Sequence, residues 1–408
     1  MTNSKNITLQ VFLTIVVFAL PAFGQTSAVF SVGFTHPNKI INAGDDHLLV
    51  TEAGNAAEPN SGRISTVNST TGERRTLITG LPSGNNTVAP NAPESVGPSA
   101  LYLQGRTLYV AISTGDAVQR HPNGIELENP DPSSPIFVSI LELSLPGKFT
   151  QLSSPFVMTL DHQFDLANHG YTTVKNGEGQ TLPIRMVVDL PNSVPNPRPD
   201  VPLNRRQSNP FGIEIFQKHL FVVDASLNLL YRISIGDGDY EHFAVFPPRP
   251  NPTPIGPPFI EAVPDSVHRV GNRLIVSMLT GFPFVSGFAE VRAISLKDGS
   301  HEVLISGLTT AIDTLHLGEN GSDGSLRPGE NSSFYTLEFS TNMLAGAPGR
   351  LRYYDTPTAA PADILSGLIT PTSMARDEAT GDLFITNIGP GTITRVSGLN
   401  TFRGTHEN

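Results

Sequence analysis

The sequence predicts an all-β fold, a six-bladed β-propeller of four-stranded blades whose N-terminal strand closes the last blade. Three observations favour this fold. One short apolar motif recurs six times, tight-turn residues separate the strands around each copy, and Gly and Pro are abundant, with 37 and 35 of 408 residues. A hydrophobic fraction of 38% with so many turn formers is typical of a β protein with short strands.

The first residues are typical of a secretory signal peptide. Lys5 precedes the apolar run 7–20, and Ala22 and Gly24 offer small side chains before a cleavage site after Gly24. An uncleaved membrane anchor is the alternative, but the run is short for a span and no basic flank follows it. We therefore expect residues 1–24 to be removed and the protein to be secreted or periplasmic, without membrane contact. The sequence has no Cys, which excludes disulfides.

The recurring motif is the strongest signal in the chain. Several apolar residues follow one another in each copy, as expected for a strand that is buried on both faces. The copies are HLLVTEAG (47–54), TLYVAIST (107–114), HLFVVDAS (219–226), RLIVSMLTG (273–281), SFYTLEFS (333–340) and DLFITNIG (382–389). Most of their spacings approach the roughly 40–50 residues of a propeller blade with loops added, which predicts six similar units.

Each copy of the motif has similar neighbours. A short strand and a tight turn precede it, as in 98–106, and a more polar hairpin follows it, as in 62–81. Turn residues of such hairpins occur at Thr71-Gly72, Asp237-Gly238 and Asp298-Gly299. Each unit is therefore expected to contain four antiparallel strands, with the recurring motif as the innermost one.

The two ends of the repeat predict that the ring closes. Only one strand, 392–398, follows the last motif, so the last unit lacks a strand. The segment 28–34 can supply it and so remove a free sheet edge. We expect the propeller to span 25–400, with a C-terminal tail at 401–408. A pair of β-sandwiches is the alternative, and six similar units argue against it.

An insertion around 115–208 interrupts the second unit. Its strand candidates are 136–145 and 184–190, with a short helix between them at 161–170. The proline-rich tracts 191–206 and 247–258 fit ordered loops between units better than docking segments for aromatic grooves.

Alignment of the six copies places several acids at one shared position near the end of the motif. That position holds Glu52, Ile112, Asp224, Met278, Glu338 and Asn387. Because the innermost strands of a propeller surround a central channel, we expect these side chains to form a ring at one mouth. A second shared position, in the preceding strand, holds Ser99, Phe211, Asp265, Asp313 and Thr372.

The polar residues of both positions predict a binding site. We expect a ligand to contact Glu52, Asp224, Glu338, Asn387, Asp313 and Asp265. Carboxylate oxygens suit a hard cation, so Glu52, Asp224 and Glu338 are also candidate ligands for calcium, although no cofactor is certain. A water-filled channel lining without a fixed ligand is the alternative.

Other motifs are weaker. Residues 319–330 have part of the spacing of a calcium loop but lack flanking helices, so a long hairpin turn fits better. His162 and His169 occur with Asp161 and Asp165 in the polar insertion. Solvated side chains are a simpler interpretation of these residues than a metal site. No Ser–His–Asp set or nucleotide-binding motif can be argued, so the sequence leaves open whether the protein is an enzyme.

Charge narrows the class of partner. The net charge is −11 and the isoelectric point about 5.4, and no basic stripe occurs. These values exclude binding to nucleic-acid backbones. A small molecule or a protein remains as the partner, and we expect a monomer because a closed ring needs no second copy to cover its edges.

Several segments resemble the ScyD/ScyE family, exported bacterial proteins named after two genes in the cluster for the scytonemin pigment. The most specific segment is LTGFPF (279–284) followed by Gly287, and 208–234 and 371–389 add to it. The resemblance covers roughly 28–400. It implies a six-bladed propeller akin to the NHL-repeat and gluconolactonase-like groups, without a settled activity.

The chain departs from this family at two positions of the expected site. Met278 stands where the family usually has Glu, and Asp265 stands where it usually has Thr. The positions that match family acids are Glu52, Asp224, Asp313 and Glu338. The loss at Met278 weakens the case for a shared cation site.

Two functional hypotheses follow. The first is an exported binding protein that holds a small polar ligand or a protein partner at the channel mouth. The alternative is a calcium-dependent lactonase or esterase-like hydrolase of the gluconolactonase type. There the metal would polarise the carbonyl group, and Asp313 is the candidate base.

Overall fold

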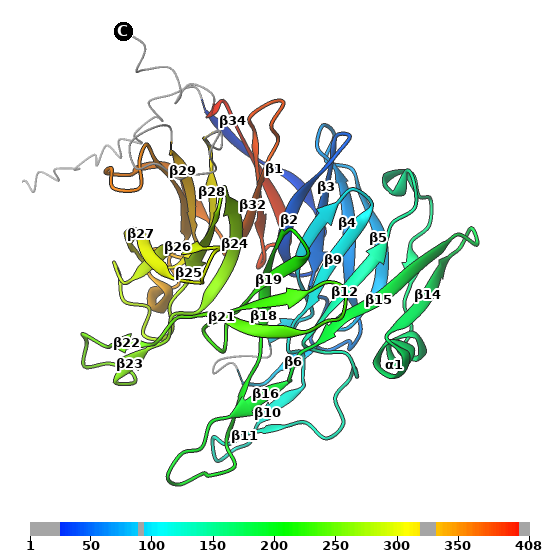
Figure 1. Ribbon diagram of the computed structural model, residues 1–408. Coiled ribbons are helices and arrows are strands. Elements are labelled where there is room, and N and C mark those ends of the chain that lie inside the picture. Colours follow the sequence, from blue (N-terminus) through cyan, green and yellow to red (C-terminus); the bar gives the residue numbers. More distant parts are fainter. Residues whose placement is uncertain (1–24, 89–93, 319–331, 400–408) are drawn as a thin grey trace, which may run out of the picture.

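The computed structural model describes residues 25–88, 94–318 and 332–399. Most of the regular structure is β-strand, and the sheets stand side by side around a common centre (Figure 1). The predicted signal peptide, the 319–330 segment and the tail 401–408 lie outside the described residues. The part of the chain described contains no helix long and apolar enough to cross a membrane.

Four sheets of the described chain have four antiparallel strands each. Their strands are β18 (Pro210–Phe216), β19 (His219–Asp224), β20 (Leu229–Ser234) and β21 (Tyr240–Val245); β24 (Pro264–Val270), β25 (Arg273–Met278), β26 (Ala289–Ser295) and β27 (His301–Leu308); β28 (Ala311–His316), β29 (Phe334–Glu338), β30 (Gly349–Tyr354) and β31 (Ala362–Leu368); and β32 (Pro371–Arg376), β33 (Leu383–Asn387) and β34 (Thr392–Ser397) with β1 (Thr26–Val32). In three of these sheets the strands follow chain order, and in the last sheet β1 lies beside β34, which is the arrangement of a propeller blade.

Two further units of the chain are fused into one ten-stranded sheet. The first contains β2 (Pro37–Gly44), β3 (His47–Glu52), β4 (Gly62–Asn68) and β5 (Arg74–Leu81); the second contains β8 (Pro98–Gln104), β9 (Thr107–Ile112), β12 (Ser139–Ser144) and β15 (Thr181–Asp189). Strands β13 (Phe156–Val157) and β14 (Tyr171–Asn176) connect them, because β13 pairs with β5 in parallel and β14 pairs with β15. The expectation of six separate four-stranded sheets is therefore corrected to four, since the insertion adds strands that join two neighbouring units.

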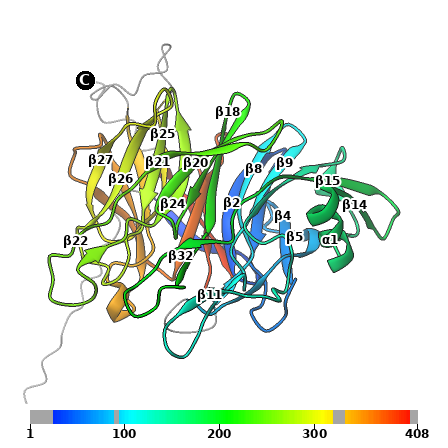
Figure 2. The same ribbon diagram turned by 60° about the horizontal axis from the view of Figure 1, so that its bottom comes forward.

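The first strand of every unit lies at the centre of the molecule. These strands contact one another in the closed order β2, β8, β18, β24, β28, β32 and back to β2. Figure 2 labels five of them, β2, β8, β18, β24 and β32, in the middle of the molecule. The recurring motif forms the second strand of each unit, so the expectation that it would be innermost is wrong. Second strands are the most apolar because neighbouring sheets cover both of their faces, whereas first strands border the central axis.

Strand β1 completes the last sheet as expected. It pairs antiparallel with β34 from Thr26 opposite Ser397 to Val32 opposite Thr392. Because β1 comes from the start of the described chain and β34 from its end, this pairing closes the ring and covers the outer edge of β34.

The predicted hairpin turns also pack one sheet against the next. Gly72, Gly238 and Gly299 have φ angles of +76°, +77° and +72°, which only Gly adopts without strain. A side chain at Gly72 would meet the carbonyl oxygen of Phe30 in β1, which belongs to the preceding sheet. A side chain at Gly238 would likewise meet the carbonyl oxygen of Val187 in β15, and one at Gly299 would meet that of Phe243 in β21. The glycines are thus required both for the turn and for the close approach of adjacent sheets.

The insertion contains the expected helix, α1 (Leu160–His169), at the margin of the molecule (Figure 1). Thr159 accepts a hydrogen bond from the backbone of His162, and His162 Nδ1 accepts one from the backbone of Thr159 at 3.1 Å, which forms a capping box. His169 and Asp165 lie 4.0 Å apart and both are exposed. His162 therefore caps the helix, and His169 and Asp165 are exposed on its surface, as expected for solvated side chains.

Candidate ligand-binding site

A cavity of about 690 Å³ lies at one mouth of the ring of first strands. Five first strands contribute a residue from their beginnings: Asn38, Phe211, Asp265, Ile312 and Thr372. Four second strands contribute the residue that directly follows them: Ala225, Leu279, Phe339 and Ile388. The volume lies within the roughly 300–1,000 Å³ of sites for small organic molecules. We call this feature the axial cavity.

Short two-stranded ribbons, which project at the bottom of Figure 1, contribute residues to the lining of the axial cavity. They are β6 (Gly84–Asn86) with β7 (Glu94–Val96), β10 (Val118–Arg120) with β11 (Glu126–Glu128), and β16 (Ser193–Pro195) with β17 (Arg205–Gln207). A fourth ribbon, β22 (Arg249–Pro250) with β23 (Phe259–Ile260), precedes the lining residues Glu261 and Val263. The two proline-rich tracts run through the third and fourth ribbons, as expected for ordered loops between units.

The acids of the recurring motif are not in this cavity. Glu52 ends β3 and is fully buried. Its carboxylate accepts hydrogen bonds from the backbone N–H of Thr35 at 2.7 Å and from the Ser65 hydroxyl, and it pairs with Arg74 at 3.0 Å. Thr35 belongs to the linker that leads into β2, so Glu52 fixes this linker to its own unit.

Glu338 and Asp224 have the same function in two other units. Glu338 accepts a hydrogen bond from the backbone N–H of Thr309 at 2.6 Å and pairs with Arg350 at 2.5 Å. Asp224 accepts one from the backbone N–H of Asn209 at 3.0 Å. Burial raises the pKa of the Asp224 carboxyl, and the hydrogen bonds that it accepts oppose this rise. Thr309 and Asn209 precede β28 and β18, so these acids also hold linkers between units.

The expected ring of acids at the channel mouth is therefore corrected. Glu52, Asp224 and Glu338 have separate partners, and no three His, Cys, Asp or Glu side chains of the described chain form a group that could hold a metal ion. Asn387 likewise turns to its own sheet, where its Nδ2 donates to Thr394 Oγ1 at 3.0 Å. Side chains alternate along a strand, so the last residue points into the sheet and the next one faces the axis.

Asp265 is the one predicted ligand-contacting residue that lines the axial cavity. The register of β24 against β25 shifts between Pro264 and Ser266, so Asp265 lies in a β-bulge. It is only 5% exposed, and its Oδ2 atom has no hydrogen-bond partner. Burial raises the pKa of its carboxyl well above the usual range; the Leu279 backbone N–H opposes this rise and Asp313 adds to it.

Asp313 is not equivalent to Asp265, which corrects the alignment of the second shared position. Pro264 pairs with Met278 and Ala311 pairs with Glu338, so Asp265 corresponds to Ile312. Ile312 lines the cavity, whereas Asp313 is fully buried beside it. Asp265 and Ile312 are both the bulged residues of their strands, and only the pairing with the second strands shows this equivalence.

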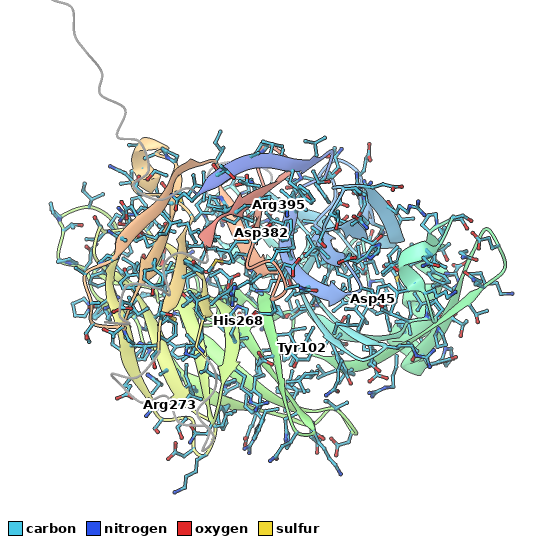
Figure 3. The ribbon with its side chains drawn as sticks, turned by 90° about the horizontal axis from the view of Figure 1, so that it is seen from above. Asp45, Tyr102, His268, Arg273, Asp382 and Arg395 are labelled. Carbon is cyan, nitrogen blue, oxygen red and sulfur yellow. The ribbon has the colours of Figure 1, made fainter. Side chains whose placement is uncertain are left out.

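Asp313 instead joins four first strands through a buried charge network. Its Oδ1 lies 2.7 Å from His268 Nε2 in β24, and its Oδ2 lies 3.4 Å from Lys39 Nζ in β2. Oδ2 also accepts hydrogen bonds from the Ser373 hydroxyl and the Met374 backbone N–H of β32, both at 3.0 Å. Burial alone would raise the pKa of Asp313, but Lys39 and His268 hold it well below the usual range. His268 lies toward the middle of the molecule in Figure 3, unlike Arg273 at its margin.

The charged residues of the axial cavity leave an excess of negative charge. Its lining contains four carboxylic acids and two arginines. Arg120 pairs with Glu126 at 2.6 Å, and Arg206 pairs with Glu261 at 3.1 Å, so each arginine is neutralised by another lining residue. The two acids left over are Glu94 and Asp265.

No family model and no curated protein sequence matches the chain. Solved structures of similar shape include an auxiliary nutrient binding protein from Bacteroides ovatus, with 7% identity and a TM-score of 0.47 over 92% of this chain and 77% of that one. A 6-phosphogluconolactonase-like protein from Bacteroides uniformis has 12% identity and a TM-score of 0.40 over 88% and 80%.

The β-propeller domain of Cps50 (Swd1) from Myceliophteria thermophila has 12% identity and a TM-score of 0.42 over 91% of this chain and 99% of that one. These identities and scores are too low for the functions of the three proteins to carry over to this chain.

Proposed function

We propose that the protein binds a small polar molecule in the axial cavity. The observation that supports this function best is Asp265, a buried carboxyl whose Oδ2 lacks a partner at the wall of a cavity of about 690 Å³. Leaving a buried polar group without a hydrogen bond costs about 1–3 kcal/mol, and more for a charged one. A ligand that hydrogen-bonds to Asp265 would recover part of this free energy.

Binding has more support than hydrolysis. A calcium-dependent hydrolase would need several carboxylates around one ion. Glu52, Asp224 and Glu338 are each engaged by backbone N–H groups or arginines of their own unit. Asp313, the candidate base, is held by four partners from other strands. The donor set therefore does not fit the gluconolactonase-type alternative.

We also infer the finer architecture and the cell location. The two halves of the ten-stranded sheet are best counted as separate blades, because their first strands take separate places in the central ring. Counted this way, the protein is a six-bladed propeller. The resemblance of 279–284 and the surrounding segments supports membership of the ScyD/ScyE family, and the N-terminal sequence supports export from the cytoplasm.

A thermal-shift screen of small polar molecules tests the proposed function. A ligand at 100 times its Kd stabilises the folded protein by about 2.7 kcal/mol, which raises the melting temperature. The Phe339→Trp variant places a larger side chain in the cavity lining, so it should lose this shift. In the control variant Val303→Trp, on the exposed surface of β27, the shift should remain. Equal shifts in wild type and Phe339→Trp, or no shift with any compound, would refute binding in this cavity.

A further inference from the structure

We propose that the ligand of the axial cavity is a small organic cation, an alkylammonium or arylalkylammonium ion whose charged group binds at Asp265. This inference rests on the proposed function and specifies the chemical class of the ligand. Three features carry it: the unpaired carboxyl of Asp265, the excess of acids over available cations, and the apolar and aromatic remainder of the lining.

The charges of the lining favour a cation over an anion. The two arginines that line the cavity are both engaged by lining glutamates, at 2.6 Å and 3.1 Å. An anionic ligand would have to break these pairs to find a counter-charge, and it would also face Asp265. A cationic ligand finds Asp265 already unpaired, and Glu94 is a second acid of the same lining that pairs with neither lining arginine.

The apolar wall favours an organic cation over a metal ion. A calcium ion takes six to eight oxygen ligands, whereas Asp265 is the only buried carboxyl in the lining. Phe211 and Phe339 both line the cavity and pack against the same core cluster. Aromatic faces attract ammonium groups, and the neighbouring aliphatic side chains suit a hydrocarbon body. The apolar lining residues include Val263, Leu279, Ile312, Phe339, Phe211 and Ile388.

Protonation of Asp265 gives this ligand class a distinctive signature. Burial raises the pKa of the Asp265 carboxyl, so protons compete with a bound cation for this group at higher pH than for an exposed carboxyl. An ammonium ion binds best to the ionised carboxylate, so binding should release a proton and strengthen as the pH rises. The other titratable or charged groups around Asp265 are Asp313 with its partners Lys39 and His268, and the lining residues Glu94, Glu126, Glu261, Arg120 and Arg206.

Titration calorimetry with three probes of nearly the same shape tests the inference. The probes are 2-phenylethylammonium, neutral 2-phenylethanol and anionic phenylacetate, measured at pH 6 and pH 8 in two buffers with different ionisation enthalpies. We expect 2-phenylethylammonium to bind at least tenfold more tightly than 2-phenylethanol, and phenylacetate to bind more weakly than both. The affinity of 2-phenylethylammonium should be higher at pH 8 than at pH 6. Its apparent binding enthalpy should depend on the buffer because a proton is released.

Two variants assign the preference to one carboxyl. Asp265→Asn keeps the shape and removes the negative charge, so it should abolish the preference for the ammonium probe while binding of 2-phenylethanol persists. Asp239→Asn, in the exposed turn between β20 and β21, is the matched control and should behave like the wild type.

The outcomes separate this inference from the proposed function. If 2-phenylethanol or phenylacetate binds as tightly as the ammonium probe, or if the preference survives in Asp265→Asn, the ligand is not a cation. The same holds if none of the three probes binds while a neutral compound from the thermal-shift screen does. In these cases binding in the cavity stands. Failure of every screened compound would instead refute the proposed function itself.

Discussion

Asp265 and Glu338 show how the surroundings of a carboxyl decide what it does. Both are almost fully buried, and both lie near the same mouth of the ring. Glu338 accepts a hydrogen bond from a backbone N–H and pairs with Arg350, so its charge is neutralised within the fold. Asp265 has an oxygen without a partner, so no group of the fold neutralises it. Buried carboxyls of the first kind stabilise the fold, whereas those of the second kind lower its stability.

The Asp265→Asn variant should therefore be more stable than the wild type at high pH. Because burial raises the pKa of Asp265, folding is disfavoured once the pH exceeds the ordinary carboxyl pKa of about 4, and the penalty grows as the pH rises toward the folded value. We expect a gain in the free energy of unfolding of about 1–3 kcal/mol at pH 8. The gain should vanish near pH 3.5, where both states are protonated. Urea denaturation at the two pH values measures it, and an equal effect at both would contradict this explanation.

The Glu338→Gln variant should lose stability. Glutamine can still accept the Thr309 hydrogen bond, but it removes the charge partner of Arg350 at 2.5 Å and leaves Arg350 paired only with Asp363 at 3.3 Å. Breaking a buried ion pair costs about 3–5 kcal/mol, and the partial exposure of Arg350 reduces the cost to about 2–3 kcal/mol. Glu302→Gln, which removes an exposed pair with Arg273, is the control and should change stability by less than about 1 kcal/mol. Equal losses in the two variants would show that burial of Glu338 has no special role.

At the scale of the elements, the insertion binds two units together. Strand β13 pairs in parallel with β5, and Met158 donates its backbone N–H to Thr79 at 3.0 Å. Gly80 follows in β5 with φ of +79°, and a Cβ atom there would lie 2.0 Å from the Met158 carbonyl oxygen. The junction between the two units therefore depends on a residue without a side chain.

Replacing Gly80 by Ala should weaken this junction. Gly44 is a matched control, because its φ is +75° and a Cβ atom there would meet nothing within 4 Å. Both variants bear the backbone strain of about 1–2 kcal/mol, and Gly80→Ala adds a steric penalty of about 1–3 kcal/mol. In urea denaturation, the free energy of unfolding of Gly80→Ala should therefore be lower than that of Gly44→Ala. If the two lose the same stability, contact between β13 and β5 contributes little to the fold.

Local patterns in the sequence were enough to predict many elements. The apolar motif predicts the second strands, the Gly-containing turns at 72, 238 and 299 have the expected conformation, and α1 lies where the insertion predicted a helix. The spare strand at the N-terminus predicts the pairing of β1 with β34. Each of these features depends on residues close together in the chain or on a simple count of strands.

Tertiary pairing decided what the sequence could not predict. Asp265 lies in a β-bulge of β24, and the pairing of Pro264 with Met278 and of Ala311 with Glu338 makes Ile312, rather than Asp313, its equivalent in β28. Strong hydrophobicity indicated burial of the recurring motif but not its distance from the axis, so its acids were assigned to the channel. Phe339 and Ile388 in the lining directly follow Glu338 and Asn387, so they could have been found by reading one residue past the shared position, because side chains alternate along a strand.

At the scale of the whole molecule, Asp313 is the charge that holds the centre of the ring together. Its partners lie on β2, β24 and β32, and it lies itself on β28. Four of the six central strands therefore share one carboxylate, far from the pairing of β1 with β34 that closes the ring at its outer edge. Loss of this charge should affect the stability of the entire ring.

The Asp313→Asn variant should be strongly destabilised at neutral pH. Removing one partner of a buried charge network costs about 3–5 kcal/mol. Lys39 and His268 lower the pKa of Asp313, so its stabilising contribution is present above the ordinary carboxyl pKa and is lost as the pH falls through the folded value. The difference between variant and wild type should therefore be large at pH 7 and smaller at pH 3. Glu378→Gln, at an exposed glutamate, is the control, and a difference that does not depend on pH would contradict the charge network.

The central claim is that the axial cavity, and not the acids at the ends of the second strands, binds the ligand. The most direct measurement compares the Kd of the strongest ligand from the thermal-shift screen in wild type, Asp265→Asn and Glu338→Gln, at a temperature where all three are folded. We predict at least a tenfold weaker Kd in Asp265→Asn and a Kd within twofold of wild type in Glu338→Gln. Weakened binding in Glu338→Gln with unchanged binding in Asp265→Asn would contradict the account.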